Sequence, residues 1–366
     1  MKTNLATAIA RVCDANALPT ADAWRACERA VEAAAVEVYG DAREFVASYD
    51  HESGDIRLEL VLRVVDEVEN PNTETTPSEL AQVDVEAEHG ETIGFPVWYL
   101  PKDRDQARVQ DAQFGSFLGL TQGRAEFGRR AVEAARAALA AVFAASRRRA
   151  IFDAYSAAVG SVVVGRVRRV GRNGTAVVSL GDRVEAILPA SEQSPRDKLT
   201  PGERIYAVVE QVSEVAGHPA VTLSRSSVGL VEALMPCIVP EIASGRVEVV
   251  RVAREAGLRT KIAVRTLRGS VDPIEASVGS GGSRVRELRQ AIGGEQVDVF
   301  AWDDNPVEAA MSAMMVPSGI WFMEADRLIA TVLPEAMAAA MGPRGVNVRL
   351  ASELAGIEIE VKEMGQ

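Results

Sequence analysis

Two short glycine-containing segments are the part of the sequence best suited to bind a charged ligand. The first consists of Gly279, Ser280, Gly281 and Gly282, and the second of Gly342, Pro343, Arg344 and Gly345. Glycine lets a phosphate approach the protein backbone closely, and a helix that begins after such a loop directs free N–H groups and the positive end of its dipole at the phosphate. The pattern predicts two clamps for a sugar–phosphate backbone, although a tight turn between two helices would use the same residues.

Basic residues surround the first loop. Between Arg246 and Arg289 there are ten Lys or Arg and five Asp or Glu, a net charge of +5 in 44 residues of a chain whose net charge is −12. Each phosphate that a Lys or Arg neutralises strengthens nucleic-acid binding in a salt-dependent way. We predict phosphate contacts from Arg284 and Arg286 after the first loop and from Arg344 inside the second. The other basic residues predicted to bind RNA are Arg259, Lys261 and Arg349.

The sequence offers no arrangement of residues that indicates catalysis or a metal site. The three histidines stand far apart without an HExxH pattern, and neither GxxxxGK[ST] nor GxSxG occurs. The segment Gly279–Arg284 lacks the Lys-Ser/Thr pair of a nucleotide-binding loop and follows a predicted helix rather than a strand. Cys13, Cys27 and Cys237 form no CxxC pair, which disfavours zinc and disulfide bonds. We therefore expect a protein that is not an enzyme and has no cofactor or metal.

Composition is typical of a globular protein with several domains. Hydrophobic residues make up 47% and charged residues 25% of the 366 residues, which disfavours disorder and suggests roughly two to four domains. No apolar run approaches the roughly 18 residues of a membrane span, and the first residues do not form a secretory signal. Residues 1–159 hold 17 basic and 26 acidic residues, a net charge of −9. This acidic charge is consistent with a domain that binds another protein, and the alternative is that it only keeps the domain soluble. We expect a monomeric, cytoplasmic protein without membrane contact.

The elements that position the loops begin with a domain over residues 1–158. A helical pattern over residues 4–38 precedes two strands with alternating apolar residues. Residues 95–123 are unusually aromatic and are predicted to be an insertion, which either modifies a contact with a partner or packs on its own domain. Residues 124–158 lack proline and are rich in alanine, which predicts a long connecting helix.

Residues 159–227 are expected to form a small β-barrel. Five short strand patterns occur there, and Asn173-Gly174 between the first two is a strong hairpin turn. This number of short strands favours a five-stranded barrel of the OB type, although other small barrels would show the same pattern.

The remaining sequence repeats one unit, over residues 228–303 and 304–366. In each unit the order is helix, strand, strand, helix, glycine loop, helix and strand, and an offset of 63 residues aligns Arg286 with Arg349 and Gly293 with Gly356. This order resembles the KH domain, whose GxxG loop clamps about four nucleotides. The predicted fold class is multidomain α+β: an α/β N-terminal head with a long connecting helix, a five-stranded OB-type barrel, and two tandem KH domains of the prokaryotic type II order α-β-β-α-α-β.

Two segments, Pro240–Val264 and Val271–Val285, resemble the first KH domain of the NusA family of bacterial transcription factors, and Val184–Pro189 resembles the barrel of that family. The resemblance implies that the N-terminal domain binds core RNA polymerase at the flap region of the β subunit, through residues that it does not identify. It implies that the barrel and KH domains bind nascent single-stranded RNA. It also implies modulation of pausing, termination and antitermination, often with other Nus factors, without covalent chemistry.

The sequence departs from the family pattern in two places, and two other classes of protein share some of its domains. Ser280 and Gly281 put no charge in the first loop, where family members usually carry a basic residue, and Tyr206 is the only aromatic residue of the barrel. A phosphorolytic nuclease is disfavoured, because those enzymes place KH before the barrel and need a large catalytic core. An RNA chaperone or ribosome-assembly factor without polymerase contact would use the same RNA-binding domains and stays open.

Overall fold

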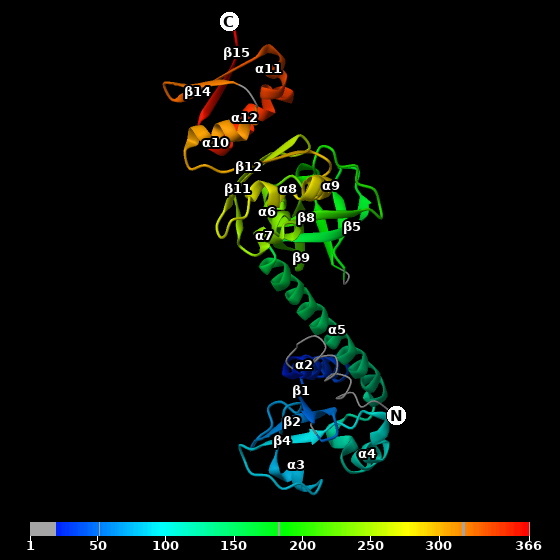
Figure 1. The fold of residues 1–366 in the computed structure, drawn as a ribbon. Helices are drawn as coiled ribbons and strands as arrows, with labels where there is room; N and C mark the ends of the chain where they lie inside the picture. Colours follow the sequence, from blue (N-terminus) through cyan, green and yellow to red (C-terminus); the bar gives the residue numbers. More distant parts are fainter. Residues whose placement is uncertain (1–19, 51, 182–183, 317–318, 366) are drawn as a thin grey trace. The chain divides into compact units, whose positions relative to one another are not determined.

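The computed structural model describes residues 20–50, 52–181, 184–316 and 319–365 (Figure 1). Its contacts divide the chain into two compact units, Met1–Ala150 and Ile151–Gln366. The part of the predicted N-terminal helix that precedes residue 20 lies outside the described residues.

The first unit is built around a four-stranded sheet. Its elements are α2 (Thr20–Tyr39), β1 (Glu44–Asp50), β2 (Asp55–Val64), β3 (Glu74–Thr75), α3 (Pro77–Ala81), β4 (Thr92–Pro96), a 3-10 turn (Pro101–Asp103), α4 (Arg104–Leu118) and α5 (Arg124–Ala157), which continues into the second unit. Every second residue of β2 is buried, as its alternating sequence predicts, and α2 contributes Cys27, Val31 and Ala35 to the same core. Burial of one face fixes the register of such a sheet, because a shift by one residue would expose that face.

The aromatic segment 95–123 belongs to the core of this unit. Phe95 of β4 packs edge-on against Phe114 and Phe117 of α4, and Leu118 is buried in the same cluster. Of the two interpretations of this segment, packing on its own domain is therefore what the structure shows. The sequence pattern did not predict α4, whose first half is almost entirely polar.

The second unit begins with a closed five-stranded barrel. Its strands are β5 (Val162–Val170), β6 (Ala176–Ser179), β7 (Glu185–Leu188), β8 (Arg204–Val215) and β9 (His218–Ser224). They follow the order β5-β6-β7-β9-β8 around the barrel, which confirms the OB-type prediction. The predicted hairpin turn is present, with Gly174 at φ 79° and a hydrogen bond from the Gly171 nitrogen to the Thr175 oxygen (2.8 Å).

Two KH units follow, and they repeat the same topology. The first contains α6 (Val228–Ile238), α7 (Pro240–Ala243), β10 (Val247–Glu255), β11 (Arg259–Thr266), α8 (Pro273–Val278), α9 (Ser283–Ala291) and β12 (Gln296–Ala301). The second contains α10 (Pro306–Met314), β13 (Ile320–Glu324), β14 (Arg327–Val332), α11 (Pro334–Met341), α12 (Val346–Ala355) and β15 (Glu358–Glu363). In each sheet the central strand runs antiparallel to the first and parallel to the last, so the internal repeat predicted from the sequence is confirmed.

The two KH units are joined by a common buried cluster. Ala263 and Phe300 of the first unit pack with Leu350 and Leu354 of the second. Arg251 of β10 adds a hydrogen bond to the carbonyl oxygen of Leu354 (2.8 Å). Burial of apolar side chains from both units disfavours their separation, so the two glycine loops belong to one packed body.

Candidate nucleic-acid interface

The first glycine of each loop is required by the backbone itself. Gly279 has φ 73° and ψ 166°, and Gly342 has φ 65° and ψ 174°, a combination that is essentially confined to glycine. A Cβ atom on Gly279 would also lie 2.7 Å from Cγ of Arg284. Both chain segments therefore turn in the same way between the helices that flank them, α8 and α9 in the first unit and α11 and α12 in the second.

The third residue of each loop is left-handed, and here the two loops differ in chemistry. Gly281 has φ 55° and ψ 24°, and Arg344 has φ 56° and ψ 28°. This conformation is free of strain for glycine but costs roughly 1–2 kcal/mol for a residue with a Cβ atom. The side chain of Arg344 is exposed, and none of the ion pairs of the described residues involves it. The second loop thus holds a cation in a strained backbone position, and the first loop holds none.

An equivalent arginine supports the third residue of each loop. Arg286 donates from Nη1 to the carbonyl oxygen of Gly281, and Arg349 donates from Nη1 to the carbonyl oxygen of Arg344 (3.5 Å). Arg349 also forms an ion pair with Glu255 of β10. Both arginines are exposed, and a guanidinium has five N–H donors, so each keeps donors for a phosphate beside its loop.

Arg284 does not lie free beside the first loop. Its Nη1 donates to the carbonyl oxygen of Ala276 in α8 and to Glu241 Oε2, the latter at 2.7 Å. The residue at the same place in the second unit is Asn347, which is buried and donates from Nδ2 to the carbonyl oxygen of Ala339 (3.3 Å). Both side chains tie together the two helices that flank the loop. Nη1 of Arg284 is thus engaged inside the protein, while the side chain is 27% exposed. Its phosphate contact stays a prediction.

Arg259 and Lys261, also predicted to bind RNA, are both buried in the ladder between β11 and β12. Arg259 pairs with Asp298 Oδ2 (2.5 Å), and Lys261 Nζ donates to the same oxygen (3.0 Å) and to the carbonyl oxygen of Ala313. Burial lowers the pKa of Lys261 from 10.5 to about 8, although Asp298 opposes that shift. Burial raises the pKa of Asp298, but the two cations outweigh it and hold this pKa below its ordinary value. Both cations pair with Asp298 inside the protein, and their burial leaves little surface for contact with a phosphate.

Fewer positive charges are therefore exposed around the first loop than the count of basic residues in the sequence indicates. Five of the ten basic residues between 246 and 289 form ion pairs, namely Arg254, Arg259, Lys261, Arg265 and Arg284. The pair between Arg254 and Glu295 is completely buried. Arg246, Arg268, Arg286 and Arg289 are exposed, and in the described residues they form no ion pair. Arg251 is exposed as well and forms no ion pair among the described residues, but its Nη1 bonds to the carbonyl oxygen of Leu354. These five are the exposed cations of this unit that a phosphate can reach.

The barrel adds exposed arginines that the sequence reasoning missed. Arg166, Arg168 and Arg169 on β5 and Arg172 in the hairpin turn are all exposed. Their signal was present in the run RVRRVGR over residues 166–172, where alternating apolar positions leave the arginines outside. Together with the arginines beside the loops, they place exposed positive charge at several separate positions of the second unit.

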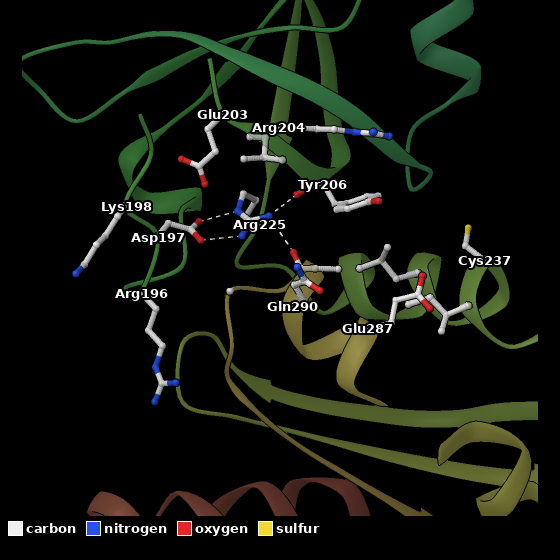
Figure 2. A pocket seen from close by; sticks show the side chains of 15 residues that line it. Arg196, Asp197, Lys198, Glu203, Arg204, Tyr206, Arg225, Cys237, Glu287 and Gln290 are labelled. Atoms are coloured by element: carbon white, nitrogen blue, oxygen red, sulfur yellow. Dashed lines mark hydrogen bonds and ion pairs between the residues drawn. The ribbon is translucent and has the colours of Figure 1, made fainter. Parts of the chain in front are cut away.

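A cavity of about 760 Å³ lies between the barrel and the first KH unit (Figure 2). At its base the buried Arg225 donates to both carboxylate oxygens of Asp197 (2.7 Å each) and to the carbonyl oxygen of Tyr206. The same guanidinium donates to the carbonyl oxygen of Ala291 at the end of α9 (3.2 Å). One arginine thus joins the barrel to the KH unit and fixes the walls of the cavity relative to each other.

The described part of the chain shows neither a metal site nor a membrane-spanning helix. It contains no group of three or more His, Cys, Asp or Glu residues that could hold a metal ion. Among the helices whose residues are described, none is long and apolar enough to cross a membrane.

The barrel, the two KH units and their loops define an RNA-binding protein. Family models match successive parts of the chain: a NusA N-terminal domain over residues 4–114, an S1 RNA binding domain over 156–224, a NusA-like first KH domain over 225–302 and a NusA-like second KH domain over 307–366. The first match extends through most of the segment 95–123 that the sequence pattern marked as an insertion.

Curated relatives are similar to this chain over most of their length. The transcription termination/antitermination protein NusA of Thermus thermophilus is 35% identical over 327 residues, which are 88% of this chain and 78% of that protein. The NusA protein of Bacillus subtilis is 31% identical over 341 residues, or 91% of this chain and 84% of the relative. That of Mycobacterium tuberculosis is 35% identical over 246 residues, or 64% and 71%. The chain belongs to the NusA family, and is therefore a transcription termination/antitermination factor with RNA-binding domains rather than an enzyme.

Proposed function

We propose that this chain binds nascent single-stranded RNA on the barrel and on both glycine loops while its N-terminal domain is bound to RNA polymerase. The proposal that the chain binds RNA is supported above all by one observation: the two loops have the same backbone conformation. Each loop turns through a glycine-only conformation and presents exposed arginines beside it, Arg286 at the first and Arg344 and Arg349 at the second. The residues proposed to contact RNA are Gly279, Ser280, Gly281, Gly282, Arg286, Gly342, Pro343, Arg344, Gly345 and Arg349, together with the exposed arginines of β5.

The polymerase part is supported by the N-terminal domain. That domain matches the NusA N-terminal model over residues 4–114, and residues 1–159 carry a net charge of −9, which is unsuited to nonspecific RNA binding. We propose that it docks on the flap region of the polymerase β subunit, that other Nus factors join the complex, and that the protein acts in the bacterial cytoplasm. Bound in this way, the factor would modulate pausing, termination and antitermination.

The polymerase contact is tested with the full chain and core RNA polymerase. After nuclease treatment to remove bridging RNA, the two are passed through a gel-filtration column at micromolar concentration, and we expect them to elute together. Separate elution would contradict the polymerase part of the proposal. Binding to ribosomal subunits instead would favour the ribosome-assembly alternative. A single-round transcription assay on a pause template then measures whether the factor changes the lifetime of the paused complex.

The RNA contact is tested by a variant of the second loop. Pro343→Asp combined with Arg344→Asp places like charge against the phosphates, so we expect weaker binding of single-stranded RNA with unchanged elution on the polymerase. Thermal denaturation checks that the variant is folded. Unchanged RNA affinity at low salt would mean that the second loop is only a turn between helices.

A further inference from the structure

The cavity between the barrel and the first KH unit has walls that are held rigidly before any ligand arrives. Arg225 is buried and bonds to Asp197, to the backbone of β8 at Tyr206 and to the end of α9 at Ala291. Its charge is neutralised by Asp197, so it serves as the base of the cavity rather than as a binding group. Fixed walls reduce the ordering cost of binding a ligand.

One wall carries a cation that lacks an anionic partner. Arg204 of β8 lies directly opposite Arg166 of β5 in the barrel ladder, and both side chains are exposed. Arg166 donates to the carbonyl oxygen of Gly202 (2.7 Å), whereas no ion pair of the described residues involves Arg204. Like charges directly opposite each other destabilise a sheet, and an anion bound beside Arg204 would remove that repulsion.

The same cavity offers both an apolar surface and polar groups of the kind that contact a nucleobase. Tyr206 is half-buried in the cluster that includes Leu234 of α6, and the cavity is lined by both. Glu287 and Gln290 line it from α9 and are exposed (Figure 2). An aromatic face stacks on any base, and carboxylate and amide groups pair with base edges.

The cavity also lies within reach of RNA bound at the first loop. Helix α9 begins at Ser283, directly after that loop, and carries Gln290 near its end. The seven steps along the helix from Ser283 to Gln290 span about 10 Å, a distance that a few nucleotides of extended RNA cover. RNA held at the first loop can therefore follow α9 to the barrel.

We propose that this cavity takes one unpaired nucleotide of the bound RNA, with its base against the ring of Tyr206, its phosphate at Arg204 and its base edge facing Glu287 and Gln290. The inference rests on the proposed RNA-binding function and adds to it a place where RNA passes between the barrel and the first KH unit. It also gives the barrel's single aromatic residue a role in base stacking.

Cys237 provides a test that needs no substitution. Its thiol lines the cavity and is exposed, whereas Cys27 is buried. Single-stranded RNA of sufficient length to reach from the loop to the cavity is added to the full chain at saturation, and alkylation by N-ethylmaleimide is followed peptide by peptide with mass spectrometry. We expect RNA to slow the alkylation of Cys237 several-fold, while Cys27 stays unreactive with and without RNA.

Variants of Tyr206 test the stacking directly. Tyr206→Ala should weaken RNA binding at least about fivefold, the low end of the effect of losing one base stack, and Tyr206→Phe should bind as the unchanged chain does. Arg204→Ala should lower the slope of log K against log salt by about 0.7, the value for one phosphate on a single strand. Fluorescence anisotropy of labelled RNA measures both quantities.

The outcomes separate this inference from the function on which it rests. If the unchanged chain binds RNA but Cys237 is alkylated equally fast in its presence, and Tyr206→Ala binds normally, the nucleotide site is refuted while RNA binding by the loops stands. If the unchanged chain does not bind RNA at all, the proposed function itself fails. Should Tyr206→Ala not fold, the protection of Cys237 in the unchanged chain still decides the question.

Discussion

Exchanging the third residues of the two loops, through Arg344→Gly and Gly281→Arg, separates the effect of charge from that of backbone shape. The two residues have φ and ψ values that agree within a few degrees, 56° and 28° against 55° and 24°. A Cβ atom on Gly281 would have no neighbour within 4 Å. The exchange therefore moves one positive charge from the second loop to the first, and the Cβ atom that it adds at position 281 meets no neighbour.

The stability change follows from the left-handed backbone. An arginine there costs roughly 1–2 kcal/mol relative to glycine, while glycine stabilises the unfolded chain by about 0.4–1 kcal/mol. The difference predicts that Arg344→Gly raises the free energy of unfolding by roughly 0–1.5 kcal/mol and that Gly281→Arg lowers it by a similar amount. Gly281→Ala is the matched control, since it introduces the backbone strain without the charge.

For each variant, RNA affinity is expected to change in the direction opposite to its stability: Arg344→Gly is more stable but binds RNA more weakly. One phosphate contact on a single strand contributes about 0.7 to the slope of log K against log salt, which corresponds to about fivefold in affinity at 0.1 M relative to 1 M salt. We expect Arg344→Gly to bind about fivefold more weakly at 0.1 M salt and Gly281→Arg to bind about fivefold more tightly. Gly281→Ala should leave the slope unchanged.

Two measurements check these numbers. Urea denaturation gives the free energies of unfolding, and anisotropy titrations of one single-stranded RNA at several salt concentrations give affinities and slopes. The interpretation of Arg344 as a strained phosphate-binding residue is refuted if Arg344→Gly leaves affinity and slope unchanged. It is also refuted if that variant loses more than about 1 kcal/mol of stability, because the glycine would then have removed a structural contact instead of strain.

Three further predictions concern the supporting side chains. Arg225→Ala should lower the free energy of unfolding by about 3–5 kcal/mol because Asp197 is left buried and unpaired, and an added Asp197→Leu should recover much of that loss in urea denaturation. For Lys261, the folded-state pKa of about 8 lies below its ordinary 10.5, so the unfolded state binds more protons between these values and stability rises with pH there. The stability of the unchanged chain relative to Lys261→Met should therefore increase by up to about 3 kcal/mol from pH 8 to 10.5, and a flat difference would contradict the buried charge. Arg349→Ala should cost less than about 1 kcal/mol, since its pair with Glu255 is partly exposed, yet weaken RNA binding in the anisotropy assay.

Much of the fold follows from local patterns in the sequence. Strict alternation of apolar residues defines β2, and the Asn173-Gly174 turn defines the first barrel hairpin, since both depend on interactions between residues that are close in sequence. The repeated order of elements around two glycine loops was sufficient to predict both KH units. Helix α4 was missed because Ala107 and Gln110 occupy the inward positions of its first half and give little apolar signal, while its large core residues lie near its end.

The charge of the first KH unit shows why the site was predicted less well than the fold. The count of +5 ended at Arg289, and Glu295 and Asp298 lie just beyond it. These two acids pair in the interior with three of the counted cations, Arg254 of β10 and Arg259 and Lys261 of β11, and the pairs require all three strands of the sheet to be assembled. A count over a sequence window cannot distinguish such cations from exposed ones, because that distinction depends on strand pairing.

At one position of the internal repeat, the type of residue did not indicate what its side chain does in the structure. Arg284 and Asn347 occupy the same position and both donate to a carbonyl oxygen of the preceding helix. One is a cation and the other is neutral, so the shared requirement is a side-chain N–H donor that joins two helices. The alignment of the repeats contained this information, because a position that accepts both Arg and Asn does not depend on positive charge.

The two loops are therefore unequal in a way that suggests different roles on one RNA. The first has glycine at three of its four positions and no charge of its own, so it allows the closest approach of a sugar–phosphate backbone. The second carries Arg344 in a strained conformation, and a cation kept there against a backbone cost points to a selected electrostatic contact. Because the common core of the KH units joins the loops, an RNA anchored by charge at the second loop would be presented to the first. The close approach at the first loop, next to α9 and the barrel, would then position the strand without needing a charge of its own.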